Sequence, residues 1–331
     1  MDYAGKICFI TGGASGAGFG QAQIFSEAGM KVVIADVRQD HLDEAMEHFK
    51  ATGAPVHAIK LDVTDRPAWA AAAAETEAVF GDTPDLLILT AGVNTFGPPE
   101  ASTFDDFDWV IGVNLGGVIN GIVTFVPRML KAGRPGHIAI TNSFCLFGPT
   151  DCVPYAASKA AVFALGESYY FALKPYGIGV TLICPVNINS RIYEAAIKTR
   201  PENLRNTGYN VNEATQAFLA ETHKSGMDPR VLADWLKRGI DSGVFLVVPY
   251  EHGAQMVEKG QRRYLDYMTP EGMKRFEDEQ GAPPTAEELK LIIEREGGEM
   301  KPGGGPGTGP DIGFGKARSD FDWVSPDKRV K

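Results

Sequence analysis

The sequence is poor in cysteine and histidine, with four of the former and six of the latter in 331 residues. Cys8, Cys145, Cys152 and Cys184 form no C-x-x-C pair, and the histidines lie far apart along the chain. Zinc sites and disulfide frameworks need closely spaced ligands or paired cysteines, so this distribution argues against both. We therefore expect neither a metal centre nor a fold held by disulfides.

Positive charge and long apolar runs are also scarce. The chain carries 32 Lys and Arg against 42 Asp and Glu, a formal net charge of −10, which disfavours nucleic acid and anionic membranes as partners. No segment approaches 18 uninterrupted apolar residues, and "MDYAGKICFITGG" lacks the basic and apolar regions of a signal peptide. These features predict a cytoplasmic enzyme whose partner is a small molecule.

The chain does contain a regular alternation of strand and helix patterns. Short apolar runs with the character of buried parallel strands occupy residues 6–11, 31–36, 56–63, 85–92, 136–143, 179–185 and 244–249. Helical patterns separate them, and this alternation predicts an α/β fold with one doubly wound parallel sheet of about seven strands, of the Rossmann type. We expect one domain over residues 1–250 and a C-terminal extension over 251–331.

A glycine-rich turn follows the first predicted strand. Gly12, Gly16 and Gly18 fit the spacing T-G-x-x-x-G-x-G, so backbone N–H groups around Ser15 and Ala17 and a helix N-terminus could receive a pyrophosphate. The glycines alone would fit an ordinary turn equally well. A P-loop is excluded because no lysine stands at the required place.

Asp36, at the end of the second predicted strand, makes the coenzyme interpretation more specific. It lies 20 residues after Gly16, where a carboxylate accepts hydrogen bonds from the adenine ribose and repels a 2′-phosphate. Arg38 could approach such a phosphate, but no basic residue precedes Gly16 to assist it. The sequence therefore favours NAD over NADP.

Four polar residues suggest acid–base chemistry at the same sheet edge. Tyr155 and Lys159 are four residues apart in a predicted helix, so the ammonium lies beside the phenol and stabilises its ionised form. Lowering a tyrosine pKa by two to three units takes about 3–4 kcal/mol, which Lys159 and an oxidised nicotinamide could supply together. Ser143 ends a predicted strand, and Asn114 in an apolar helix would bend that helix around a water molecule.

Together these residues resemble the short-chain dehydrogenases/reductases over about residues 1–250. The matching elements are T-G-x-x-x-G-x-G at 11–18, Asp36, "LDV" at 61–63, "AG" at 91–92, Asn114, Ser143, "YAASK" at 155–159 and "PVNINS" at 185–190. The resemblance implies hydride transfer between NAD(H) and a secondary alcohol or ketone. It makes Tyr155 the general base or acid, Ser143 the holder of the substrate oxygen and Asn114 the anchor of a proton-relaying water.

The same resemblance implies the remaining coenzyme contacts. Lys159 would bind the nicotinamide ribose, Asp62 and Val63 would flank the adenine, and the segment after the sixth strand would border the nicotinamide. The predicted coenzyme-binding residues are Gly12, Ser15, Gly16, Ala17, Gly18, Asp36, Asp62, Val63, Ala91, Gly92, Tyr155, Lys159, Pro185, Ile188 and Ser190.

Two positions depart from the family pattern. Thr90 stands where N-A-G has its asparagine, and we expect its hydroxyl to keep the local bonding. Val186 replaces the glycine of the usual P-G, which restricts the backbone beside the nicotinamide and alters the pocket without removing it.

The substrate is less visible in the sequence. Residues 191–242 interrupt the strand pattern and are expected to form a substrate lid, and Phe96, Phe144, Phe147 and Tyr193 are candidates for an apolar pocket that binds an aromatic or polycyclic alcohol. Ordinary core packing explains these aromatic residues equally well.

A narrower resemblance concerns "GGASGAGFGQA", "AGVNTFGP", "DDFDWVIGVNL", "GVINGIVTFVPRM" and "GRPGHI". These segments are similar to bacterial Cα-dehydrogenases that oxidise the benzylic alcohol of lignin-derived β-aryl ethers. Hydroxysteroids and 3-hydroxyacyl compounds are the alternative substrates.

Two other classes of protein fit less well. Lyases and epimerases on extended relatives of the fold carry T-G-x-x-G-x-x-G, and a non-enzymatic dinucleotide sensor has no need of Ser143, Tyr155 and Lys159 together. Homo-oligomers are usual in the family, so a homodimer or homotetramer is expected.

The extension beyond residue 250 contains two helical patterns. Residues 252–268 read as a helix, and Thr285 with Glu288 forms a capping box before a second helix. A Gly/Pro-rich tail follows, with Ile312, Phe314, Phe321 and Trp323 near its end. We expect this tail to lie across the lid or a neighbouring subunit, with a solvated tail as the alternative.

Overall fold

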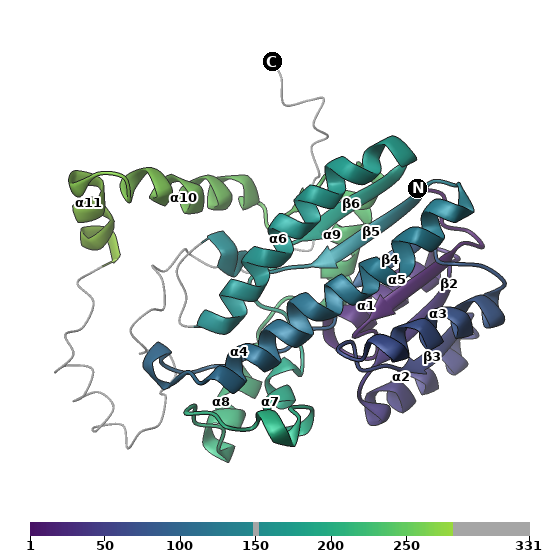
Figure 1. Ribbon diagram of the computed structural model, residues 1–331, viewed down its shortest axis with the longest axis horizontal. Coiled ribbons are helices and arrows are strands. Elements are labelled where there is room, and N and C mark those ends of the chain that lie inside the picture. The colour runs from purple at the N-terminus through teal and green to yellow at the C-terminus, as the bar shows by residue number, and fades with distance from the viewer. Residues whose placement is uncertain (148–151, 281–331) are drawn as a thin grey trace.

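The structure is a computed structural model that describes residues 1–147 and 152–280. Its centre is a parallel sheet of seven strands in the order β3-β2-β1-β4-β5-β6-β7 (Figure 1). The strands are β1 (Ile7–Thr11), β2 (Lys31–Asp36), β3 (Val56–Lys60), β4 (Leu86–Leu89), β5 (Gly136–Thr141), β6 (Ile178–Ile183) and β7 (Leu246–Val247). Six of them lie within predicted runs and β6 begins one residue before its run of 179–185, so the expected α/β fold with a doubly wound sheet is confirmed.

Helices cover both faces of this sheet. The described helices are α1 (Gly16–Glu27), α2 (Gln39–Thr52), α3 (Arg66–Phe80), α4 (Phe104–Ile111), α5 (Gly117–Ala132), α6 (Val153–Leu173), α7 (Ala195–Lys198), α8 (Glu213–Lys224), α9 (Pro229–Asp241), α10 (Gly253–Asp266) and α11 (Pro270–Gln280). One core cluster joins α1, α2 and α9 to the sheet, and a second joins α3, α5 and α6 to its other face. Because both faces are covered, strands such as LLIL in β4 are apolar and buried at every position.

The helix Phe104–Ala132 is long and apolar enough to span a membrane by length and composition. Half of its most apolar stretch is buried inside the domain, and Val118, Ile122 and Phe125 belong to the core cluster on that face of the sheet. These contacts identify it as a core helix. A π-helical turn, Gly112–Gly116, separates its α4 and α5 segments and contains Asn114.

The carboxyl ends of the parallel strands gather the residues that the sequence singled out. The glycine turn follows β1, Asp36 ends β2, Thr90 follows β4 and Ser143 follows β5. The chain leaves β1 toward β2 and β3 on one side and continues from β4 to β7 on the other. This reversal of strand order between β1 and β4 opens a crevice at the carboxyl edge, which is the usual ligand site of such sheets.

Residues 191–242 divide into two parts. The first part, residues 191–224, contributes residues to the wall of a pocket, and we call it the pocket cover. It contains the short helical turns Ile192–Glu194 and Glu202–Leu204 together with α7 and α8. The second part is α9, whose Leu232, Leu236 and Ile240 are buried in the core beside α1. The pocket cover is therefore shorter than the predicted lid, because α9 belongs to the layer that covers the sheet.

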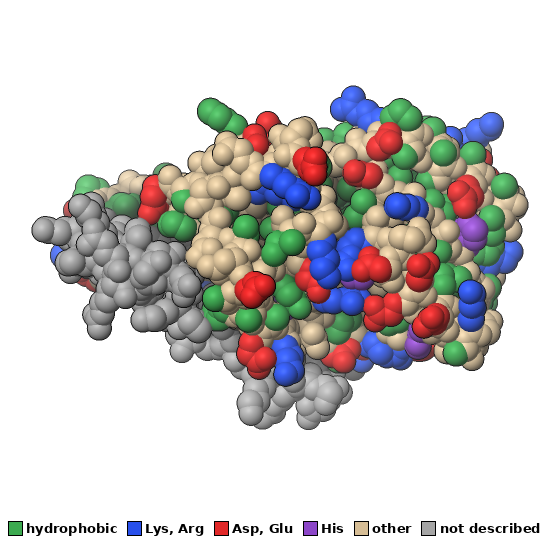
Figure 2. All heavy atoms as spheres, turned by 90° about the horizontal axis from the view of Figure 1, so that it is seen from below, with side chains coloured by type: hydrophobic (Ala, Val, Ile, Leu, Met, Phe, Trp, Pro, Cys, Tyr) green, Lys and Arg blue, Asp and Glu red, His purple; other side chains and the backbone are tan. Residues whose placement is uncertain are grey.

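Basic and acidic groups connect this cover to the coenzyme half of the domain. Arg191 on the cover binds Glu44 of α2 at 2.9 Å, and Glu194 binds both Arg38 and, at 3.1 Å, Lys198. Figure 2 views the molecule from the side on which α2, α7 and α8 lie in Figure 1, and it shows basic and acidic side chains interleaved there.

The C-terminal extension begins with α10, which confirms the helix predicted over residues 252–268, and continues into α11. Arg263 on α10 donates to the backbone carbonyl of Phe147, so α10 packs against the segment that follows β5. Thr285, Glu288 and the Gly/Pro-rich tail lie outside the described residues.

A buried ion pair attaches the pocket cover to α4. Arg200 and Asp106 are 3% and 0% exposed, and the Nη1 to Oδ1 distance is 2.6 Å. The Arg200 guanidinium also lies 5.1 Å from the ring centroid of Trp109, while the second oxygen of Asp106 accepts from the backbone N–H of Thr103 to close a capping box. Removing one partner of such a pair leaves the other charge buried without compensation.

We expect Arg200→Met to lower the free energy of unfolding by about 3 kcal/mol, because Asp106 would keep its charge in an apolar setting. Lys274→Met is the matched control, since Lys274 pairs with Asp278 on an exposed surface and should change stability by less than about 0.5 kcal/mol. Urea denaturation measures both values. Equal effects of the two substitutions would contradict a structural role for the buried pair.

Candidate active site

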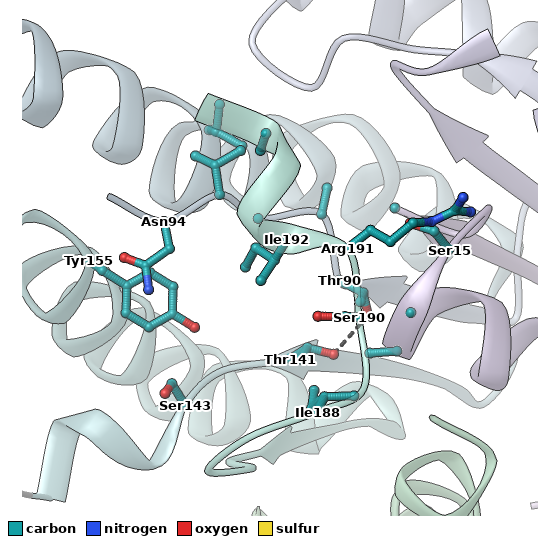
Figure 3. Close-up of a pocket in the computed structure, with 18 of the residues that line it drawn as sticks. Ser15, Thr90, Asn94, Thr141, Ser143, Tyr155, Ile188, Ser190, Arg191 and Ile192 are labelled. Atoms are coloured by element: carbon teal, nitrogen blue, oxygen red, sulfur yellow. Dashed lines mark hydrogen bonds between the residues drawn. The ribbon is translucent and has the colours of Figure 1, made fainter. Parts of the chain in front are cut away.

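A cavity of about 970 Å³ lies between the carboxyl edge of the sheet and the pocket cover. Figure 3 shows its two ends, with Ser15 and Arg191 at one and Ser143 and Tyr155 at the other. The sequence-predicted residues that line it are Gly12, Ser15, Gly16, Ala17, Asp36, Asp62, Val63, Ala91, Gly92, Phe96, Ser143, Tyr155, Lys159, Pro185, Ile188 and Ser190. The fold thus brings the coenzyme and catalytic candidates other than Gly18 and Asn114 together in the lining of one cavity.

Tyr155 and Lys159 project from the first turns of α6, one helical turn apart. The Lys159 ammonium nitrogen lies 5.4 Å from the Tyr155 ring centroid and donates to the backbone carbonyl of Thr141 at 2.9 Å. Lys159 is 4% exposed, whereas Tyr155 is partly buried and faces the cavity. The helical spacing therefore places the phenol and the ammonium side by side, as expected. The last residue of β5 holds the ammonium in position.

Burial opposes charge on both groups in this state. It lowers the pKa of Lys159 from its usual value to about 8. Burial also raises the pKa of Tyr155 well above its ordinary value, while the Ser143 side chain acts in the opposite direction. The lowered phenol pKa expected from the sequence does not arise from Lys159 alone, because desolvation outweighs it. A further positive charge in the cavity would act against this desolvation and favour the phenolate of Tyr155.

Ser143 is held in place by its neighbour Asn142, which the sequence argument missed. The backbone N–H of Ser143 donates to Asn142 Oδ1 at 2.8 Å, and Asn142 Nδ2 donates to the carbonyl of Lys159 at 3.1 Å. Asn142 is 2% exposed and so bridges β5 and α6 from inside the protein. Its place directly before Ser143 was the available signal.

Asn114 lies behind the cavity and not in its lining. Its Oδ1 accepts from the Val93 N–H at 2.8 Å, and its Nδ2 donates to the Val93 carbonyl and to Ser158 Oγ, both at 3.0 Å. Ser158 Oγ in turn donates to the carbonyl of Tyr155 at 2.7 Å. The helix does depart from α geometry at Asn114, as the sequence analysis expected, and this amide connects the segment after β4 to the catalytic helix.

The glycine turn can approach a ligand closely because side chains would not fit in it. Gly12 has a φ of +64°, and a Cβ there would lie 2.9 Å from Ala91 Cα. A Cβ on Gly18 would lie 2.0 Å from the carbonyl oxygen of Gly12, so Gly18 packs the start of α1 against the turn and does not line the cavity. The N-terminus of α1 therefore faces the cavity at Ser15 and Gly16, which fits a pyrophosphate.

Asp36 and Arg38 both line the cavity at the predicted adenine ribose position, and carboxylates bind Arg38 there. Asp36 Oδ1 accepts from the backbone N–H of Arg38 at 3.0 Å, and burial raises the pKa of this carboxyl. The Arg38 guanidinium binds the carboxylates of Asp40 and Glu194, and these contacts raise its pKa. Arg38 is therefore paired with carboxylates on two sides.

The two departures from the family pattern are accommodated locally. The hydroxyl of Thr90 lies 2.7 Å from Thr141 Oγ1, the contact drawn in Figure 3, and donates to Gln21 Oε1 at 2.6 Å. The expected local bonding of Thr90 is thus present, with Gln21 of α1 as a partner that the sequence did not reveal. Val186 lines the cavity, and its N–H donates to the Tyr250 hydroxyl at 2.9 Å.

The predicted aromatic residues do not all meet the cavity. Phe96 lines it, whereas Phe144 and Phe147 are 5% and 3% exposed in a core cluster with Cys184. Tyr193 stacks on His223, with ring centroids 6.0 Å apart, and only His223 belongs to the lining. Further apolar lining residues that the sequence analysis did not name are Val93, Trp109, Val113, Ile192, Ala195, Leu204, Leu219 and Met227.

Comparison with known proteins points to the same family that the sequence motifs resemble. The chain is 48% identical over 270 residues to the C alpha-dehydrogenase of Sphingobium sp. (strain NBRC 103272 / SYK-6), an alignment that spans 81% of this chain and 88% of that protein. The apo form of LigD from Sphingobium sp. strain SYK-6 has 42% sequence identity and a TM-score of 0.67, and the match covers 81% of this chain and all of that one.

A second solved structure is that of a short chain dehydrogenase/reductase from Burkholderia phymatum in complex with NAD. It has 30% identity and a TM-score of 0.74, and the match covers 81% of this chain and 96% of that chain. The family model for short chain dehydrogenases matches residues 6–201, more than half of the chain. The protein therefore belongs to the short-chain dehydrogenase family and is an oxidoreductase that acts on CH–OH groups.

Proposed function

We propose that the protein oxidises the benzylic secondary alcohol of a β-aryl ether to a ketone, with NAD as the hydride acceptor. The observation that carries this proposal is the shared cavity, which has Ser143, Tyr155 and Lys159 at one end and the glycine turn with Asp36 at the other. An alcohol and a dinucleotide can be held there end to end.

The substrate class rests on the cavity wall and on relatedness. Near Tyr155 the wall includes the apolar side chains of Val93, Trp109 and Leu204, which pack in one cluster with it and suit aromatic rings. The Sphingobium relative with 48% identity is a C alpha-dehydrogenase. This likeness favours a benzylic alcohol over the hydroxysteroid and 3-hydroxyacyl alternatives.

In the proposed reaction, Ser143 holds the substrate hydroxyl and Tyr155 removes its proton as the carbinol C–H bond breaks. Bound NAD would supply the acceptor for the hydride of that carbon, and the alcohol, having lost a proton to Tyr155 and a hydride to the coenzyme, would leave as a ketone. The wall formed by Pro185, Ile188 and Ser190 would border this ring. The side chain of Tyr155 alternates between phenol and phenolate through each cycle.

Lys159 and Asn114 have supporting roles in this proposal. Lys159 lies close enough to Tyr155 to stabilise the phenolate, and its ammonium has further donors available for the ribose hydroxyls. An oxidised coenzyme held beside Tyr155 would add a second positive charge that favours the phenolate. Asn114 binds the segment after β4 and, through Ser158, the backbone of Tyr155, where a water relay toward solvent would begin.

NAD is the proposed coenzyme because of the charges at the end of β2. A 2′-phosphate would meet the Asp36 carboxylate, and Arg38, the neighbouring cation, is already engaged by Asp40 and Glu194. The NAD complex of the Burkholderia phymatum relative supports the same choice.

The assembly and location stay predictions. Val123 on α5 and Phe171 on α6 are 64% and 67% exposed, and apolar groups of this size on helix faces suit the homodimer or homotetramer expected from the family. A cytoplasmic location is expected from the sequence.

The substrate assignment is tested by the appearance of reduced nicotinamide with NAD and a panel of alcohols. We expect a 1-aryl-2-aryloxyethanol to have a kcat/KM at least about a hundredfold above that of a hydroxysteroid or a 3-hydroxyacyl ester, because only the aryl ether matches the expected pocket. The reverse ranking would contradict the substrate class while leaving the family assignment intact.

Tyr155→Phe should reduce oxidation by about ten-thousandfold while NAD binding persists, because the phenyl ring keeps the packing but cannot accept the proton.

In the wild type, kcat/KM should rise with pH as Tyr155 ionises. Lys159→Met should move this rise to higher pH, since the phenolate loses its neighbouring cation. An unchanged pH profile in the lysine variant would contradict its role beside Tyr155.

The coenzyme assignment predicts that Asp36→Asn narrows the preference for NAD over NADP by about tenfold or more, because it removes a negative charge from the 2′-phosphate position. Asp43→Asn is the control, since Asp43 is exposed on α2, accepts from Gln39 and does not line the cavity. The ratio of kcat/KM for the two coenzymes is the measurement. A ratio that responds equally to both substitutions would overturn the role of Asp36.

A further inference from the structure

Asn94 is a polar residue in the cavity wall that has no part in the proposed proton and hydride transfer. It is 9% exposed and lines the cavity, and its Oδ1 is buried without a hydrogen-bond partner among the described residues. A buried amide oxygen that lacks a partner costs about 1–3 kcal/mol, so proteins rarely keep one without a use. Asn94 therefore needs an explanation beyond packing.

The position of Asn94 is fixed by the residue before it. Both backbone polar groups of Val93 are bound by the Asn114 side chain, at 2.8 Å and 3.0 Å, and the Val93 side chain packs in the same cluster as Tyr155. In Figure 3 the Asn94 amide lies at the Tyr155 end of the pocket, away from Ser15 and Arg191 at the coenzyme end. Asn94 is therefore carried by a rigid segment toward the place where the reacting carbon must lie.

The amide of Asn94 suits recognition of an oxygen atom. Its Nδ2 is a donor, its Oδ1 is an acceptor, and a half-turn about the last side-chain torsion exchanges them without changing the shape of the group. The surrounding wall, including Val93 and Trp109, is apolar. A substrate with only carbon and hydrogen next to the reacting carbinol would leave the Asn94 amide without a hydrogen-bond partner. A substrate with an oxygen atom there would provide one.

We propose that Asn94 is a specificity-determining residue that hydrogen-bonds a second oxygen of the substrate, one or two carbons from the reacting carbinol. This inference rests on the proposed oxidation of a benzylic alcohol. The second oxygen is an ether oxygen, which accepts from Nδ2, or a second hydroxyl, which can also donate to Oδ1. The residue thus selects oxygenated aryl alcohols over hydrocarbon ones of the same shape.

Three benzylic alcohols test this proposal in the full-length enzyme with NAD. A 1-aryl-2-aryloxyethanol carries the ether oxygen, a 1,3-diarylpropan-1-ol replaces that oxygen by a methylene group, and a 1-aryl-2-aryloxypropane-1,3-diol adds a second hydroxyl. We expect the wild type to prefer at least one oxygenated compound over the methylene analogue by about tenfold in kcat/KM. Asn94→Leu, which keeps the side-chain size but removes both polar atoms, should reduce this preference to about one.

Thr95→Val is the matched control. Thr95 is 3% exposed and its Oγ1 also lacks a partner among the described residues, but it does not line the cavity. This variant should keep the wild-type preference. Asn94→Ala gives a second test if the leucine variant does not fold, with circular dichroism and NAD binding as checks of integrity.

The outcomes separate this inference from the proposed function. A preference lost in the Asn94 variants and kept in Thr95→Val supports it, and the compound whose advantage disappears identifies the ether or the hydroxyl as the recognised oxygen. A preference that survives Asn94→Leu or Asn94→Ala, or equal turnover of all three compounds by the wild type, would overturn it. Failure of the wild type to oxidise any of the three would instead contradict the proposed function.

Discussion

The site depends on the buried ammonium group of Lys159, which lies at the end of β5. The residue is only 4% exposed. Desolvation lowers the pKa of Lys159 to about 8, and hydrogen-bond acceptors around the ammonium compensate for part of the lost contact with water. The Thr141 carbonyl supplies one acceptor, and Asn142 fixes the lysine backbone from the same strand end. The end of β5 thus holds the ammonium of Lys159 beside the ring of Tyr155. The contacts of Asn142 fix the backbone of Ser143 and Lys159 relative to this strand end.

Electrostatics also join the two halves of the cavity. Burial disfavours charge on both groups: it raises the pKa of Tyr155 well above its ordinary value, and it lowers the pKa of Lys159 to about 8, which leaves the ammonium charged near neutral pH. In the proposed reaction an oxidised coenzyme would bring positive charge to this end, and Tyr155 would then be available as the base when the hydride acceptor is in place. At the other end, Arg38 joins the strand that carries Asp36 to Glu194 of the pocket cover, which connects the coenzyme half to the substrate half.

The sequence predicted most of the fold and most residues that line the proposed coenzyme half of the cavity, because both depend on local pattern. Buried runs marked the strands, and the glycine turn, Asp36 and the Tyr155–Lys159 spacing are each readable within a few residues. Gln21 and Asn94 could not be identified in this way, since the role of Gln21 comes from a partner far along the chain and that of Asn94 from a missing partner. Phe144 and Phe147 show the same limit, because spacing cannot distinguish core from pocket.

Ultraviolet difference spectroscopy of tyrosinate formation tests the central claim most directly. The signal that wild type gives and Tyr155→Phe lacks reports the ionisation of Tyr155 alone among the ten tyrosines. With NAD bound, we expect this ionisation below the ordinary tyrosine pKa of about 10, and at clearly higher pH in the absence of NAD or in Lys159→Met. If Tyr155 ionised at or above its ordinary pKa with NAD bound, or if Lys159→Met left its ionisation unchanged, the paired phenol and ammonium could not be the catalytic base.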